Sequence, residues 1–164
     1  MQHRLRLGSA FCGLVGLING IVATAALQHS VAAEQPEPAR RVAIRPEKSP
    51  NTGLPYSPGI LAGNTLYVSG HLGRDPVSAK LVPGGIEAET RQSLANIREV
   101  LRSAGLDFRN VVSVTTYIAS FEDFAKFNAV YRESFPVDPP ARATVQVAAL
   151  NDGARVELQM IASR

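Results

Sequence analysis

The chain has 164 residues, of which 45% are hydrophobic and 19% charged, a composition that fits one globular domain and excludes a disordered chain. Lysine and arginine together number 17 against 14 acids, but Arg4 and Arg6 fall in an N-terminal leader that contains no acid. Without that leader the net charge is +1, which is too low for the broad positive field that nucleic-acid binding needs.

The first 33 residues have the pattern of a secretory signal peptide. Arg4 and Arg6 precede an uncharged stretch over residues 7–27, and residues 31–33 provide the small side chains that a signal peptidase recognises. The same stretch is long enough to span a bilayer as an uncleaved anchor. Its glycines weaken such a helix, so we expect cleavage after Ala33 and a periplasmic or secreted protein, with a membrane anchor over residues 7–27 as the alternative.

The domain expected to remain covers residues 42–164, after a short proline-containing tether over residues 34–41. Residues 41–45 alternate in polarity and predict a first strand. The prolines and glycines of residues 46–59 exclude a regular element there. Residues 65–69 are rich in β-formers and predict a second strand.

Residues 86–104 carry the clearest helical pattern of the chain. Their apolar side chains recur at spacings of three and four, and Gly105 is well suited to end the helix. The residues expected on the buried face are Ala88, Leu94, Ile97, Leu101 and Ala104.

Residues 111–118 are mostly β-branched and predict a strand, after which Ser120 is placed to cap a second helix. That helix carries an aromatic stripe, which we expect to pack in the core rather than to bind a ligand. The stripe consists of Phe124, Phe127, Tyr131 and Phe135. Residues 143–149 and 154–162 predict two final strands.

The predicted order of elements is β, β, α, β, α, β, β. Two helices cannot cover both faces of so wide a sheet, so we expect an α+β fold with a mixed or largely antiparallel sheet and both helices on one face. Self-association is the simplest way to cover the other face.

The residues present exclude several kinds of chemistry. The only cysteine, Cys12, and two of the three histidines lie in the leader, which leaves His71 without the companions that a metal site requires. No phosphate-binding glycine motif and no serine nucleophile elbow occurs, so we expect neither metal nor cofactor. Polar residues remain at strand ends and in loops: Tyr56, Ser69, His71, Asn128, Arg142, Glu157 and Gln159.

Arg142 is the most informative of these residues. It follows Pro139, Pro140 and Ala141 and opens an apolar strand. An arginine at the mouth of a strand presents a fixed, always charged fork that suits a carboxylate. The alternative is an exposed arginine paired with a surface acid.

Several segments taken together resemble the RidA (YjgF) family over residues 42–164. These segments are residues 54–59, with Pro55-Tyr56; residues 66–71, a strand ending in Ser69-Gly70-His71; residues 91–97; residues 123–131; and residues 140–145, with Pro140-Ala141-Arg142.

The resemblance implies a chorismate-mutase-like subunit that forms a homotrimer with clefts between neighbouring subunits. It also implies hydrolysis of reactive enamines and imines to 2-oxo acids or ketones and ammonia. In that picture Arg142 binds a substrate carboxylate, while Tyr56, Ser69, Gly70 and Asn128 help to line the cleft. No nucleic acid is expected as a partner, nor a membrane once the leader is removed.

The sequence departs from the family pattern at two positions. The acid of the family's last strand is matched to Gln159, which cannot accept a proton at neutral pH, and His71 stands where the family has Gln. Gln159 and His71 are therefore the expected catalytic positions beside Arg142, with Glu157 roughly 6–7 Å from Gln159 on the same sheet face. A non-catalytic small-molecule or protein-binding trimer and a ribonuclease are the alternatives.

Overall fold

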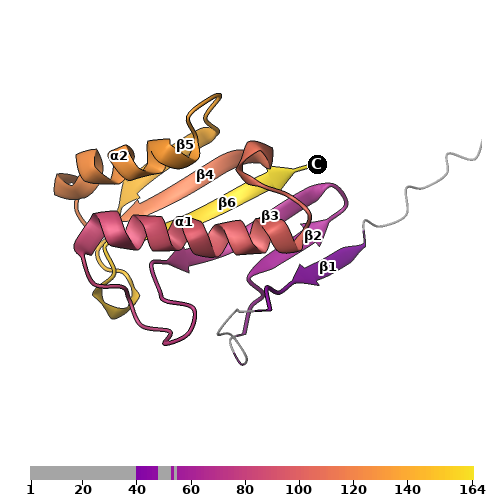
Figure 1. Cartoon of the computed structure of the whole chain (residues 1–164), viewed down its shortest axis with the longest axis horizontal. Helices are drawn as coiled ribbons and strands as arrows, with labels where there is room; N and C mark the ends of the chain where they lie inside the picture. The colour runs from indigo at the N-terminus through magenta and orange to yellow at the C-terminus, as the bar shows by residue number, and fades with distance from the viewer. Residues whose placement is uncertain (1–39, 48–52, 54) are drawn as a thin grey trace, which may run out of the picture. The chain divides into compact units, whose positions relative to one another are not determined.

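The computed structural model describes residues 40–47, 53 and 55–164, so the predicted leader and most of the tether lie outside the described residues. Figure 1 shows the elements in chain order. They are β1 (Arg41–Ile44), β2 (Gly59–Ala62), β3 (Thr65–Leu72), α1 (Gly85–Ser103), a 3-10 turn η1 (Phe108–Asn110), β4 (Val111–Ile118), a turn η2 (Phe121–Asp123), α2 (Phe124–Ser134), β5 (Ala141–Gln146), a turn η3 (Asn151–Gly153) and β6 (Val156–Ser163).

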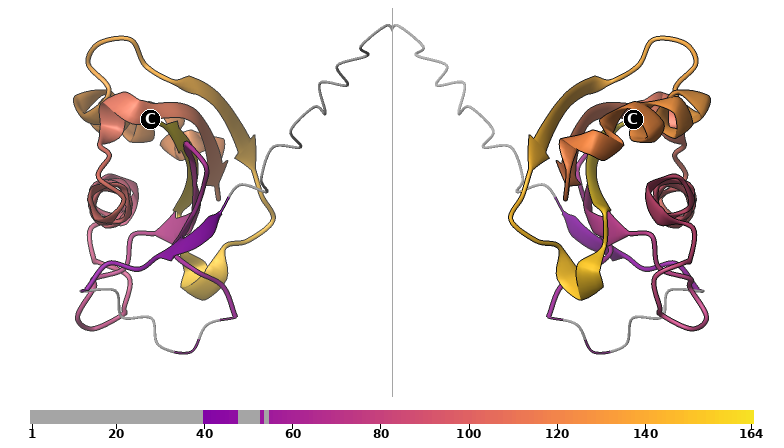
Figure 2. Two further views of the ribbon diagram at one scale, coloured as in Figure 1. Left: turned by 90° about the vertical axis from the view of Figure 1, so that its right-hand side faces the viewer. Right: turned by 90° about the vertical axis from the view of Figure 1, so that its left-hand side faces the viewer.

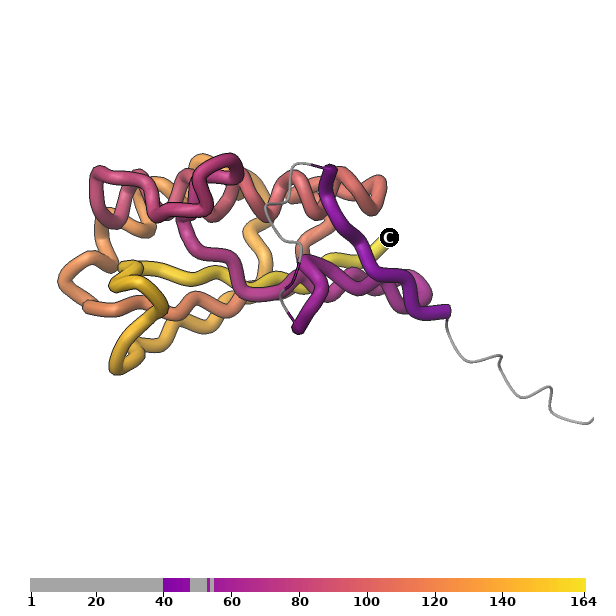
Figure 3. The backbone as a smooth tube through the Cα atoms, turned by 90° about the horizontal axis from the view of Figure 1, so that it is seen from below, coloured from indigo at the N-terminus to yellow at the C-terminus, as the bar shows by residue number. Residues whose placement is uncertain are grey.

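The strands form one sheet in the order β1-β2-β3-β6-β4-β5. Neighbouring strands are antiparallel except β4 and β5, which run parallel. Both helices lie against one face of this sheet (Figure 2), and the tube view separates the helical layer from the strand layer (Figure 3). The predicted α+β fold, with a mixed sheet and two helices on one face, is confirmed.

The strand β2 is absent from the sequence-based prediction. It lies between Pro58 and a tight turn in which Gly63 has φ 57°, and it pairs with β1 on one side and β3 on the other. Four residues between such breakers give too little pattern to recognise alone, and the pairing partners on both sides stabilise the strand. Other strand boundaries also differ from the prediction: β3 extends to Leu72, β5 covers Ala141–Gln146 rather than residues 143–149, and β6 begins at Val156.

Polar side chains of α1 hold the end of β3 in place. Ser93 Oγ donates to the carbonyl of His71 at 2.8 Å, and Asn96 Nδ2 donates to the carbonyls of Leu72 and Arg74. At Gly73 the helix approaches so closely that a Cβ atom would lie 2.4 Å from a backbone atom of α1. The segment that follows Ser69 and Gly70 is therefore fixed by the helix beneath it.

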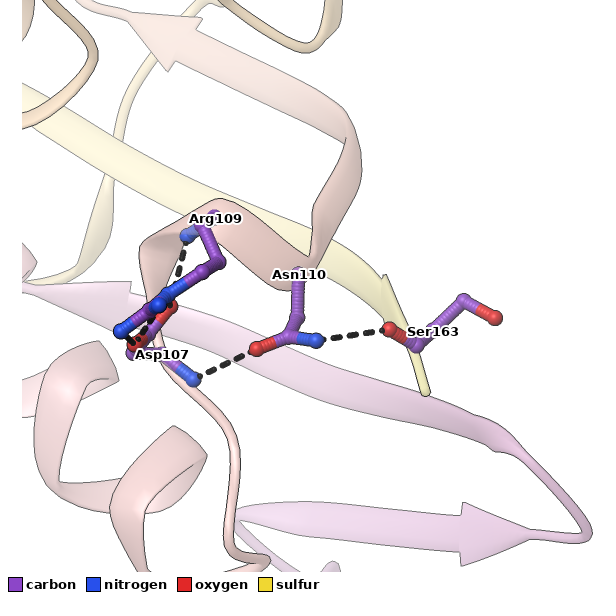
Figure 4. Close-up of polar contacts among 4 residues, drawn as sticks. All are labelled: Asp107, Arg109, Asn110 and Ser163. Carbon is purple, nitrogen blue, oxygen red and sulfur yellow. Dashed lines mark hydrogen bonds and ion pairs between the residues drawn. The ribbon is translucent and has the colours of Figure 1, made fainter.

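The connection from α1 to β4 is built from local caps. Gly105 adopts φ 72°, as expected for the residue that ends the helix. The side chain of Asp107 accepts from the amide of Arg109 at 2.9 Å, and Asn110 Oδ1 accepts from the amide of Asp107 at 3.0 Å. Asn110 Nδ2 also donates to the carbonyl of Ser163, which ties the end of β6 to this turn (Figure 4).

The helix α2 packs through its aromatic stripe. Phe127 is fully buried, and Tyr131 and Phe135 are nearly so, as predicted from the pattern. Ser120 caps the start through the amide of Glu122, although one turn of 3-10 helix comes before α2 itself.

The sheet face away from the helices carries exposed apolar side chains in the described part of the chain. Tyr67, which is 51% exposed, lies on this face between its cross-strand neighbours Ile60 and Ile161, which are partly buried. An exposed apolar patch of this kind marks an interaction surface. None of the helices within residues 40–47, 53 and 55–164 combines the length and the apolar character needed to cross a membrane.

Candidate functional site

Arg142 lies at the start of the edge strand β5 with its guanidinium group against α2. Its Nη2 donates to Asn128 Oδ1 at 2.7 Å. The guanidinium carbon is 4.4 Å from the ring centroid of Tyr131, 5.2 Å from that of Phe127 and 5.9 Å from that of Phe124. The aromatic stripe of α2, which was expected only to pack in the core, therefore also contacts the Arg142 guanidinium. Each close ring stabilises this cation by about 0.5–2 kcal/mol.

The charge of Arg142 has no acidic partner within the described residues. The ion pairs present there join other arginines to acids. Burial raises the pKa of Tyr131 to about 12, although the nearby charge of Arg142 acts in the opposite direction. The phenol is therefore neutral at physiological pH, and the guanidinium donors that do not bind Asn128 are left for an external anion.

A hollow of about 330 Å³ opens beside this arginine. Its size is at the lower end of the range for small-molecule sites. It is lined by Asn128, Tyr131, Arg132, Phe135, Pro139, Pro140 and Arg142.

A second group of polar residues lies on β3 and β6. Ser69 Oγ donates to the carbonyl of Ser57 at 2.5 Å, which holds the loop carrying the half-exposed Tyr56. Glu157 extends its carboxylate over Gly70, where a Cβ atom would lie 1.8 Å from Oε1. Burial raises the pKa of Glu157 above its ordinary value of 4.5. Only a glycine leaves room for this carboxylate.

The two residues expected to be catalytic from sequence occupy different surroundings. Gln159 is exposed on the sheet, where its Oε1 lies 3.4 Å from the hydroxyl of Tyr117. His71 Nδ1 lies 2.8 Å from the carbonyl of Ser69, so Nδ1 carries the proton and Nε2 the lone pair. Burial lowers the pKa of His71, which keeps the ring neutral near pH 7. Glu157, which the sequence-based prediction named as a nearby acid without a catalytic role, is the acid that contacts Gly70.

Arg142 and Glu157 cannot act on one small molecule within a single chain. Arg142 pairs with Val114, which pairs with Met160, so Glu157 is two strands across and three residues along from Arg142. These steps correspond to a separation of roughly 14 Å between the backbone positions. The side chains also lie on opposite faces, because Glu157 alternates with the buried residues of β6 whereas Arg142 contacts α2.

No cluster of three or more metal-binding side chains occurs in the part of the chain that the structure describes.

Residues 46–164 match the family described as Endoribonuclease L-PSP. The chain belongs to this family, which is the RidA (YjgF) family predicted from the sequence.

Relatives and solved structures of the RidA family resemble the chain over most of their length. The 2-iminobutanoate/2-iminopropanoate deaminase of Bos taurus is 48% identical over 74% of this chain and 89% of its own, and that of Homo sapiens is 45% identical over 75% and 89%. The YjgF gene product of E. coli has a TM-score of 0.71 and 32% identity over 75% of this chain and 98% of its own.

Gly70→Ala tests whether the position of the Glu157 carboxylate matters in this RidA-family chain. The new methyl group meets the end of a flexible side chain, so we expect an intact fold with a displaced carboxylate. If that carboxylate transfers a proton in the reaction, turnover should fall by about tenfold or more. Gly73→Ala is the contrasting variant, because its methyl group meets the backbone of α1 and should cost about 1–3 kcal/mol of stability. Thermal melts and steady-state rates measure the two effects. Unchanged turnover in Gly70→Ala would mean that the carboxylate position is unimportant.

Proposed function

We propose that the chain hydrolyses imines and enamines derived from 2-amino acids to 2-oxo acids and ammonia. The observation that carries the proposal is Arg142, which has no acidic partner within the described residues and is held by Asn128 and the Tyr131 ring at the edge of a hollow. Such a fork binds a carboxylate through two parallel hydrogen bonds. The mammalian relatives named as 2-iminobutanoate/2-iminopropanoate deaminases support the same reaction.

The proposed reaction needs little besides orientation and proton transfer, because the carbon of a protonated imine is already electrophilic. The Glu157 carboxylate accepts a proton from water while the water oxygen bonds to that carbon and the C=N electron pair moves to nitrogen. The protonated Glu157 then returns the proton to nitrogen. The C–N bond breaks as ammonia leaves and the ionised Glu157 takes the hydroxyl proton, so that the oxygen becomes the carbonyl. Glu157 then passes this proton to the departing ammonia, which leaves as ammonium. For an enamine, protonation at carbon gives the imine first.

The two halves of this proposed site come from different copies of the chain. Arg142 lies on a free sheet edge, while Glu157 lies on the sheet face that the helices leave open and is roughly 14 Å away in the same chain. A neighbouring copy that covers the open face with its β5 edge brings the two together. A closed ring of such copies is the trimer expected from the family.

We therefore expect the chain to behave as a trimer in solution. Light scattering should give three times the subunit mass at micromolar concentration. Tyr67→Glu places a negative charge on the open sheet face of each chain, so it should dissociate the trimer. Turnover should be lost at the same time, since each site needs two chains. A monomeric wild-type protein that retains turnover would contradict the shared site.

The function is tested by adding purified protein to imines generated in solution from alanine and from larger amino acids. Faster release of 2-oxo acid and ammonia than in buffer supports the deaminase. Binding of pyruvate without any turnover would instead favour the non-catalytic binding trimer. The ribonuclease implied by the family description has less support, because the net charge of +1 expected after cleavage gives little attraction for phosphate.

We also propose that residues 1–33 are removed on export, which would place the reaction outside the cytoplasm. The pattern of Arg4, Arg6, an uncharged core and Val31-Ala32-Ala33 supports this. The intact mass of protein from the envelope fraction should correspond to a chain that begins at Glu34. A full-length mass would indicate an uncleaved anchor.

A further inference from the structure

The hollow beside Arg142 contains a second arginine that the proposed reaction does not use. Arg132 and Arg142 both line it, together with the Asn128 amide. Asn128 and Arg132 are four residues apart on α2, so their Cβ atoms lie on one face of the helix about 5–6 Å apart. Asn128 accepts from the Arg142 guanidinium at 2.7 Å, which places the Arg132 side chain one helical turn beyond the carboxylate-binding fork.

No acid offsets these two positive charges among the residues that line the hollow. The carboxylate of Glu133, which follows Arg132 in the sequence, pairs instead with an arginine of α1. Arg91 Nη2 donates to Glu133 Oε1 at 2.8 Å. The remaining walls are apolar or neutral, since the lining is completed by Tyr131, Phe135, Pro139 and Pro140. A hollow with two cations, an amide and apolar walls suits a short ligand with a negative charge at each end.

We propose that Arg132 determines substrate specificity by binding the second carboxylate of a dicarboxylic 2-imino acid. The carboxylate next to the imine lies on Arg142, the carbon chain crosses the apolar wall, and the distal carboxylate pairs with Arg132. The assignment to imine substrates rests on the proposed function, whereas the preference for a dianion does not. The competing explanation is that Arg132 only complements the dipole at the C-terminal end of α2, where a cation is favourable.

The test compares dicarboxylic and monocarboxylic ligands on the full chain. Calorimetry with 2-oxoglutarate and pyruvate should show tighter binding of 2-oxoglutarate by the wild type. Arg132→Gln should weaken the binding of 2-oxoglutarate by about fivefold, the upper end for an exposed ion pair, and leave the affinity for pyruvate within about twofold. Arg132→Glu should weaken 2-oxoglutarate further, because it repels the distal carboxylate. Rates on imines generated from glutamate and alanine should follow the same ratios.

Lys126→Gln is the matched control, because it removes an exposed cation from the same helix outside the hollow. It should leave the ratio of the two affinities unchanged. If Arg132→Gln lowers only thermal stability, or weakens both ligands equally, Arg132 is a helix-end cation and the proposal is wrong. If the wild type turns over no imine but still prefers 2-oxoglutarate through Arg132, the specificity assignment stands and the deaminase proposal fails.

Discussion

Arg142→Ala should weaken the binding of pyruvate by roughly tenfold or more, because hydrogen bonds of a charged group contribute about 1.5–3 kcal/mol. It should also lower kcat/KM for 2-iminopropanoate by about a hundredfold, since the same fork orients the imine toward water. Arg142→Lys should recover little. A lysine cannot form the planar double hydrogen bond, and it loses the stacking on Tyr131 at 4.4 Å and the pairing with Asn128. Calorimetry and initial rates measure both quantities.

Arg98→Ala is the matched control for this prediction. Arg98 also stacks on an aromatic ring, that of Phe108 at 4.9 Å, but it lies on α1 away from the hollow beside Arg142. Both variants lose an arginine that covers a ring, so losses of stability should be similar in size. Only Arg142→Ala should lose affinity for pyruvate. An equal loss in both variants would assign the effect of Arg142 to packing.

The sequence predicted the strong elements of the fold correctly, because each carries a long and regular pattern. The strand β4 was predicted with its exact bounds, and the residue that ends α1, Gly105, has the positive φ its role requires. The strand β2 was missed because four residues between breakers do not form a pattern on their own. Its stability comes from partners on both sides, which only the assembled sheet reveals.

The candidate site could be predicted only in part, and the reason lies in the strand period. Arg142 and Asn128 were both selected from sequence, and the structure brings them into contact. Glu157 and Gln159 are two residues apart on one strand, so their side chains lie on the same face of the sheet. A motif match alone therefore does not decide which of the two positions corresponds to the acid of the family. The packing of Gly70 against Glu157 distinguishes them, and this contact joins strands β3 and β6 that are remote in sequence.

Glu157→Gln should lower kcat by about 10²- to 10⁴-fold while KM changes little, because proton transfer is lost and the carboxylate fork is intact. The pH–rate profile adds a second signature. Glu157 must be ionised to accept a proton from water, so the rate should fall as the pH drops through its pKa. Burial raises that pKa, so the fall should begin above pH 4.5 and should be absent in the variant. Steady-state rates between pH 4 and 9 measure it.

Stability should respond to pH in the opposite sense to activity, which separates the titration of Glu157 from acid unfolding. A carboxyl whose pKa is raised in the folded state binds its proton more tightly there, so its contribution is fully present below the ordinary value of 4.5 and is lost as the pH rises through the folded pKa. Glu157→Gln should remove this loss, so its stability relative to the wild type should increase with pH over that interval.

Gln159→Glu places an acid two residues further along β6, beside Tyr117 rather than Gly70, and should change kcat by less than about twofold if position governs proton transfer. If Gln159→Glu instead raises the rate, or restores activity to Glu157→Gln, the acid belongs at position 159 and the role assigned to Glu157 is wrong.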